Sequence, residues 1–123
     1  MRNIEAPQNA EDTVAAEWVT VLAYGQDRIN PIVPRTAYGH RPLRKLFPMV
    51  SHGVLHLSRC IKYPWTHDIG TAFPQAVGGY RVRRESDHTL IGVVETVEEA
   101  YELITANLPE GCGPAIDGTP EDL

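Results

Sequence analysis

Prolines restrict the fold of this chain more than any other residue type, because ten of its 123 residues are proline. Four of them fall between positions 26 and 48: Pro31, Pro34, Pro42 and Pro48. Proline lacks the amide that a helix interior or a central strand requires. We therefore expect an irregular segment here, with residues 35–41 forming a basic loop. A loop of this length in so small a domain is usually functional or wraps a partner subunit.

Apolar residues recur at helical spacing before this segment. One face of the predicted helix collects Val14, Trp18, Val21 and Leu22, at positions i, i+4, i+7 and i+8. Candidate N-cap residues precede the stripe: Asn9, Asp12 and Thr13. The helix is expected to end near Gly25, with Trp18 as a core anchor.

Residues 53–61 alternate as a strand does. One face of this strand would hold Leu55, Leu57 and Ile61, and the other Val54, His56, Ser58 and Cys60. Arg59 falls on the apolar face, so we expect it at the strand end or paired with a carboxylate. Residues 79–84 and 89–94 predict a hairpin, in which Arg81 and Arg83 share one face.

A capping box, Thr96-Val97-Glu98-Glu99, predicts a second helix through Asn107. Its apolar stripe comprises Val97, Ala100, Tyr101, Ile104 and Leu108. The order of elements predicts one α+β domain over residues 1–123. In it, a small antiparallel sheet of three or more strands is covered on one face by two helices. A long Pro-rich loop joins helix 1 to the first strand, and residues 1–8 and 115–123 are loose termini.

Charge is distributed unevenly along the chain. Between positions 35 and 84 there are nine Arg and Lys residues and one carboxylate, Asp68, although the whole chain has net charge −5. Two interpretations stay open: acidic helices neutralise the basic middle, within one subunit or across a dimer, or a concave basic surface binds an anionic ligand. The open face of a small sheet favours a homodimer. A nucleic-acid partner is not expected, because no binding motif accompanies the acidic pI of about 5.4.

The sequence predicts a cytoplasmic protein. It has no apolar run of 18 residues, so no membrane partner is expected. Its first residues lack the pattern of a signal peptide. The two cysteines, Cys60 and Cys112, are expected as free thiols in a reducing compartment, and whether they meet in space is left open.

Residues 51–70 contain three of the five histidines and are the expected site. Proton transfer near neutral pH suits histidine, so the candidate catalytic residues are His52, His56, His67 and Asp68. The candidate substrate-binding residues are Arg35, Arg41, Arg59, Tyr63, Trp65, Arg81 and Arg83. Purely structural roles stay open, with His56 as an ordinary sheet histidine and Asp68 as a loop cap.

Other chemistries have weaker support. On a strand, four residues span about 13 Å, so His52 and His56 cannot share one zinc ion. No metal and no other cofactor is expected. Cys60 is a candidate nucleophile, but a single cysteine in a strand is more often a small buried hydrophobe.

Several segments carry a family resemblance. They are Leu46-Phe47-Pro48-Met49-Val50-Ser51-His52-Gly53, Ser58-Arg59-Cys60, Tyr63-Pro64-Trp65-Thr66-His67-Asp68 and the ending over residues 106–115. Over residues 43–115 the chain resembles a small actinobacterial family of natural-product biosynthesis proteins. Within that group it is similar to the lysinoalanine-forming proteins of cinnamycin- and duramycin-type lantibiotic clusters.

The resemblance implies an enzyme that closes a macrocycle in a ribosomally made peptide. A peptide Lys amine adds to dehydroalanine, an aza-Michael addition that needs no cofactor, and a carboxylate of the peptide can act as the base. The implied partner is a modified peptide containing dehydroalanine and Lys. Two alternatives stay open: a non-catalytic peptide-binding or immunity module, and a metal-assisted hydrolase.

Overall fold

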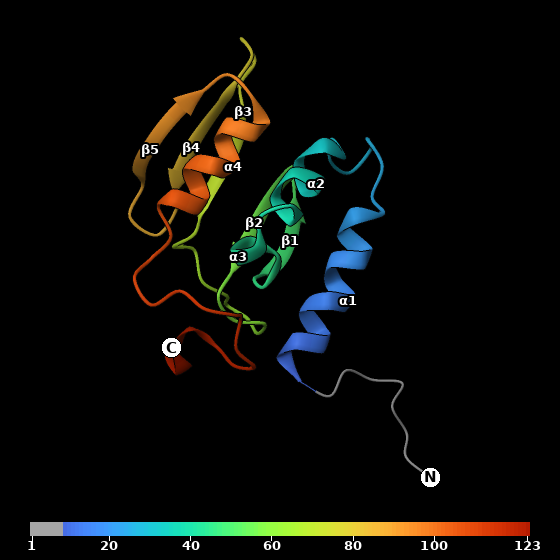
Figure 1. The fold of residues 1–123 in the computed structure, drawn as a ribbon, viewed down its shortest axis with the longest axis vertical. Coiled ribbons are helices and arrows are strands. Elements are labelled where there is room, and N and C mark those ends of the chain that lie inside the picture. The colour runs from blue at the N-terminus through green and yellow to red at the C-terminus, as the bar shows by residue number, and fades with distance from the viewer. Residues whose placement is uncertain (1–8) are drawn as a thin grey trace.

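The computed structural model describes residues 9–123, and the prediction for residues 1–8 lies outside them (Figure 1). The helices are α1 (Ala10–Leu22), α2 (Ile32–Tyr38), α3 (Arg41–Arg44) and α4 (Val97–Ala106), with a final 3₁₀ turn at Pro120–Asp122. The strands are β1 (Phe47–Ser51), β2 (Val54–Ser58), β3 (Gly70–Pro74), β4 (Tyr80–Arg84) and β5 (Thr89–Val94). The α+β class is confirmed. The antiparallel strands form two sheets, β1-β2 and β3-β4-β5, with β2 beside β3.

Helix α1 begins where the sequence predicts. The Asn9 side chain accepts a hydrogen bond from the Asp12 amide at 2.9 Å. Three residues of the apolar stripe are buried and Leu22 is half-buried, and Trp18 is only 1% exposed. Trp18 Nε1 donates to the carbonyl of Leu46 at 3.0 Å. This bond ties α1 to the start of β1, and the helix lies alongside that strand (Figure 1).

The expected long irregular loop is wrong, because α2, α3 and β1 occupy it. Pro34 is the third residue of α2 and Pro42 the second of α3. Amides in a first helical turn have no intrahelical acceptor, so proline costs little there. Pro48 lies in β1, which pairs with one strand only, and an edge strand tolerates proline. Residues 35–38 are therefore helical rather than a loop.

Strand β2 follows the predicted alternation over a shorter range, ending at Ser58 rather than residue 61. Leu55 and Leu57 are 1% and 3% exposed and face the core. His56 faces the opposite way and lies across from Met49 of β1. Arg59 follows the strand directly, as expected.

The hairpin of β4 and β5 and the capping box of α4 are confirmed. Strand β3, which the alternation did not single out, pairs with β4. Helix α4 packs closely on this sheet, with Tyr101 and Ile104 buried. Gly92 of β5 makes the approach possible, because a Cβ there would lie 2.7 Å from a Leu103 methyl.

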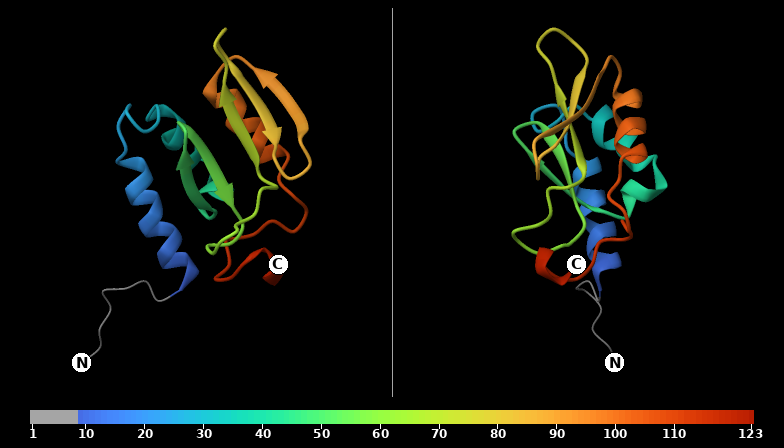
Figure 2. Two further views of the ribbon diagram at one scale, coloured as in Figure 1. Left: turned by 180° about the vertical axis from the view of Figure 1, so that it is seen from behind. Right: turned by 90° about the vertical axis from the view of Figure 1, so that its left-hand side faces the viewer.

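Helices α2, α3 and α4 all lie on one side of the strands (Figure 2). Val82 of β4 is fully buried on this side, so Arg81 and Arg83 point the other way. We call that second side the open sheet face, defined by His56, Phe73, Arg81, Arg83 and Val93. The sequence placed Arg81 and Arg83 together on one face of the hairpin, and the structure brings His56 to that same face.

Residues 115–123 are not loose, contrary to the prediction. The amide of Ala115 donates to the Lys45 carbonyl, and that of Ile116 to the Arg59 carbonyl, each at 3.0 Å. The Lys62 amide donates to Gly118 at 3.0 Å. The chain end thus joins α3 to the segment after β2. No helix within residues 9–123 is long and apolar enough to cross a membrane.

Candidate functional site

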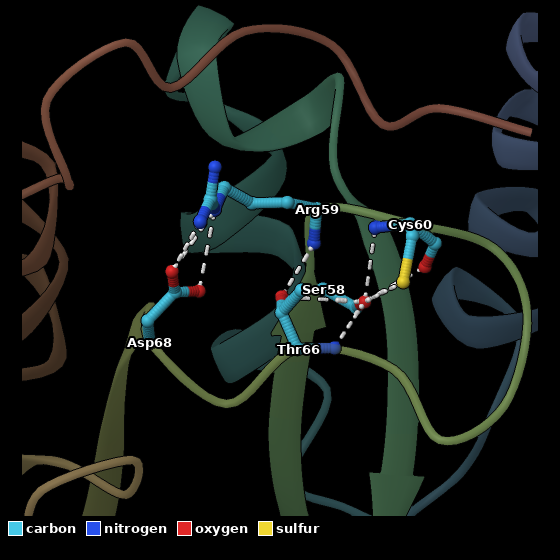
Figure 3. A network of polar contacts seen from close by, with 5 residues as sticks. All are labelled: Ser58, Arg59, Cys60, Thr66 and Asp68. Carbon is cyan, nitrogen blue, oxygen red and sulfur yellow. Dashed lines mark hydrogen bonds and ion pairs between the residues drawn. The ribbon is translucent and has the colours of Figure 1, made fainter. Parts of the chain in front are cut away.

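A buried serine organises the loop that follows β2 (Figure 3). Ser58 is fully buried. Its hydroxyl donates to the Cys60 carbonyl at 2.7 Å and accepts from the amides of Cys60 at 3.1 Å and Thr66 at 3.0 Å. The Thr66 hydroxyl accepts from the Arg59 amide at 2.8 Å. These bonds fix residues 59–66 against the strand end.

Arg59 and Asp68 form an ion pair across this loop (Figure 3). Arg59 Nη2 and Nε donate to Asp68 Oδ2 at 2.6 and 3.0 Å. The hydrogen bond to Asp68 raises the pKa of Arg59 above its ordinary value. The sequence predicted either a strand-end position or a carboxylate partner for Arg59, and both are confirmed. The ion pair thus holds together the two ends of the loop between β2 and β3.

His56 lies half-buried on the open sheet face. Burial lowers its pKa below 6.5, the nearby Glu85 opposes that shift, and the nearby His67 adds to it. The carbonyl of His67 accepts from the Ser86 amide at 2.8 Å. This bond joins the loop after β2 to the turn between β4 and β5. We call His56, His67 and Glu85 the histidine cluster.

Glu85 is the member of this cluster that sequence reasoning missed. It accepts a hydrogen bond from Arg83 Nε at 2.8 Å. Glu85 lies one residue beyond the basic segment at positions 35–84, so the charge count for that segment did not include it. Strand parity offered a signal, since Arg81, Arg83 and Glu85 alternate onto one face. Arg83 also lies over the Phe73 ring, 5.3 Å from its centroid.

Other predicted binding residues lie on β4 and in the loop after β2. Arg81 is exposed and lies opposite Phe73 in the β3-β4 ladder. Tyr63 and Trp65 lie in the loop after β2, with ring centroids 5.3 Å apart and an interplanar angle of 82°. Tyr63 is 75% exposed, whereas Trp65 Nε1 donates to the Ile61 carbonyl at 3.3 Å. The aromatic pair thus offers an exposed ring fixed to the loop.

Three predicted site residues lie away from the cluster. His52 is exposed in the turn between β1 and β2, at the other end of β2, with Nδ1 2.9 Å from Ser51 Oγ. Arg35 is exposed on α2, on the helical side of the strands. Arg41 of α3 lines a groove beside α1. The four candidate catalytic residues therefore do not form one group, and only His56 and His67 come together.

Both cysteines are free thiols in the structure. Cys60 is buried, as expected of a small hydrophobe in this position. Cys112 is half-buried, and burial raises its pKa. Across residues 9–123, the His, Cys, Asp and Glu side chains form no group of three or more arranged to hold a metal ion.

Comparison with known proteins gives the chain a family but no described activity. The chain belongs to DUF6193, a family of unknown function, which matches residues 12–119. No curated protein and no solved structure matches it.

Proposed function

We propose that this protein binds a ribosomally made peptide on its open sheet face and catalyses lysinoalanine formation, as the resemblance to lantibiotic maturation proteins implies. The observation that carries the proposal is the histidine cluster. It holds His56, whose pKa is lowered by burial, beside His67 and Glu85. A histidine that is neutral at pH 7 can accept a proton from a peptide amine.

The reaction joins a Lys Nζ to the β-carbon of dehydroalanine. The new N–C bond forms as the carbon–carbon π bond breaks, the amine loses one proton, and the α-carbon gains one. Because Lys has a pKa of about 10.4 in water, binding must favour its neutral form. A cationic surface does so, and Arg81 is exposed there without an ion pair among the described residues. Arginine donors also stabilise the enolate oxygen that develops in the transition state.

The open sheet face also suits the rest of such a peptide. Val93 is 56% exposed and Leu90 48%, which provides apolar contact beside the arginine side chains. Arg81 can bind a carboxylate of the peptide. This arrangement offers two bases for the amine proton: His56, or the bound carboxylate in a substrate-assisted reaction.

A trapping assay tests the proposal. Purified protein is incubated with a thioether-bridged precursor peptide that contains dehydroalanine and Lys, and excess thiol is then added. Addition of the amine changes no mass, so catalysis is read as disappearance of the thiol adduct. We expect the adduct to disappear only when the protein is present. If the adduct persists although the peptide binds, the protein is a non-catalytic peptide-binding module.

Two variants identify the base. If His56 takes the proton, His56→Gln lowers the rate roughly 100-fold, whereas His40→Gln leaves it unchanged. His40 is a suitable control because it precedes α3 and its side chain makes no capping bond. If the peptide carboxylate takes the proton, His56→Gln retains activity and Arg81→Ala loses it. Retention of full activity in both variants would refute a reaction on the open sheet face.

A further inference from the structure

A concave surface lies between α1, α3 and the chain segment that follows α4. We call it the α1–α3 groove, and its volume is about 650 Å³. Its lining includes the aromatic rings of Trp18 and Tyr38 and three cationic side chains, Arg41, Arg44 and Lys45. This volume falls in the range of about 300–1,000 Å³ that is typical of ligand sites.

The cations of the groove lack acidic partners in the described part of the chain. The ion pairs within residues 9–123 involve other arginines and Lys62. Arg44 lies over the Tyr38 ring, 5.2 Å from its centroid. One carboxylate, Glu11, also lines the groove, so three positive charges face one negative charge. A ligand that carries carboxylates would complete this arrangement.

The exposed ring of Tyr38, backed by the buried Trp18, gives the groove an apolar contact surface. Trp18 and Tyr38 pack edge to face, with centroids 5.2 Å apart and an interplanar angle of 64°. Trp18 is only 1% exposed and its indole N–H is bonded to the Leu46 carbonyl, so it supports the Tyr38 ring from within the core. Tyr38 is 39% exposed and offers the apolar contact. The groove therefore suits an apolar or aromatic group that is flanked by carboxylates.

The groove continues into a smaller cavity of about 300 Å³. The two hollows share Arg41, Lys45 and Pro114. The two hollows therefore meet at the shared cations. An extended ligand can follow this surface, whereas a single small anion would occupy only part of it.

We propose that the α1–α3 groove binds an extended acidic peptide segment. Its carboxylates pair with Arg41 and Lys45, and an aromatic side chain packs on Tyr38. This site lies apart from the histidine cluster, and binding there does not depend on the reaction proposed for the open sheet face.

A second copy of the chain fits the groove less well. The acidic surface it would offer is the outer face of α4, where Glu98, Glu99 and Glu102 are exposed. Docking this face into the groove joins two different surfaces. Such a contact closes as a twofold dimer only if each groove receives the α4 helix of the other copy at the same time; otherwise it propagates into a ring or an open filament.

Fluorescence anisotropy tests the site with a fluorescein-labelled octapeptide of alternating Glu and Phe. The matched probe carries Gln in place of every Glu. We expect saturable binding of the Glu peptide that weakens as salt is added, and at least about tenfold weaker binding of the Gln peptide. Arg41→Glu and Lys45→Glu should each weaken binding of the Glu peptide about tenfold.

Arg28→Glu is the control, because it makes the same charge change at an exposed residue outside the groove. It should alter affinity less than threefold. If all three charge reversals weaken affinity equally, binding reflects the net charge of the protein and the proposal is wrong. The proposal is also wrong if the Gln peptide binds as tightly as the Glu peptide. If the peptide does not bind while Arg41→Glu changes the sedimentation coefficient, the occupant is a second copy and the proposal is wrong. Thermal unfolding of each variant confirms that the comparison is between folded proteins.

Discussion

The buried hydroxyl of Ser58 accepts a hydrogen bond from the amide of Thr66 over 3.0 Å, joining residues eight positions apart. The same oxygen accepts from the amide of Cys60 at 3.1 Å. One side chain therefore satisfies two backbone donors where β2 ends. Because Arg59 and Asp68 flank these residues, the geometry of the candidate site depends on this hydroxyl.

Ser58→Ala should destabilise the protein. It leaves two buried amides unpaired, at roughly 1–3 kcal/mol each, so the unfolding free energy should fall by about 3 kcal/mol. Urea denaturation measures the change. Ser86→Ala, at an exposed position in the β4-β5 turn, is the matched control and should change stability by less than about 0.5 kcal/mol. Similar losses in both variants would contradict the assigned role of Ser58.

A double-mutant cycle on Arg59 and Asp68 should give a coupling free energy of about 1 kcal/mol. The side chains are 21% and 23% exposed, so solvent screens part of the attraction. The pair of Lys62 and Asp117 supplies the internal comparison. Its atoms are 3.3 Å apart, its side chains are 60% and 57% exposed, and it should couple by less than about 0.5 kcal/mol. Equal coupling in the two cycles would show that burial adds nothing to the Arg59 pair.

His56 should make stability depend on pH. Its pKa is lower in the folded protein than the ordinary value of 6.5, chiefly through burial. The unfolded chain therefore binds the proton more readily, and stability that is complete above pH 6.5 is lost as the pH falls toward the folded pKa. Urea denaturation at about pH 7.5 and about pH 5 should show a smaller loss for His56→Gln than for the natural protein. If the variant and the natural protein lose the same stability, the pH dependence arises from groups other than His56.

Tyr101→Phe should stabilise the protein. The Tyr101 hydroxyl is buried and has no hydrogen-bond partner among the described residues, and burial raises its pKa. Removing an unpaired buried hydroxyl should add about 1 kcal/mol to the unfolding free energy. Tyr63→Phe, at a ring that is 75% exposed, should be neutral. Destabilisation by Tyr101→Phe would mean that the hydroxyl has a partner in solution.

Local sequence patterns predicted the helices and strands that have a characteristic apolar spacing, capping box or hairpin pattern. The apolar stripe around Trp18 and the capping box at Thr96 are confirmed, as is the hairpin of β4 and β5. The prediction for the proline segment was wrong because the free-energy cost of a proline depends on its position within a helix or strand. Pro34 and Pro42 lie in first helical turns, and Pro48 lies in a strand with one partner. The sequence shows each proline but not its place within an element.

The candidate site was harder to predict, because long-range packing assembles it. Arg59 and Asp68 are close in sequence, and the expectation of a carboxylate partner for Arg59 is confirmed. Glu85 joins His56 only through the packing of β2 beside β3. The α1–α3 groove combines α1, α3 and Pro114, which no local spacing connects.

The chain segment after α4 contacts both the α1–α3 groove and the candidate site around Arg59. Ala115 lines the α1–α3 groove and its amide bonds to Lys45, whereas the next amide, that of Ile116, bonds to Arg59, whose ion-pair partner Asp68 follows His67 of the histidine cluster. Consecutive residues are thus anchored to two different surfaces. Hydrogen exchange at these two amides can distinguish a ligand that protects one surface from a ligand that stiffens both.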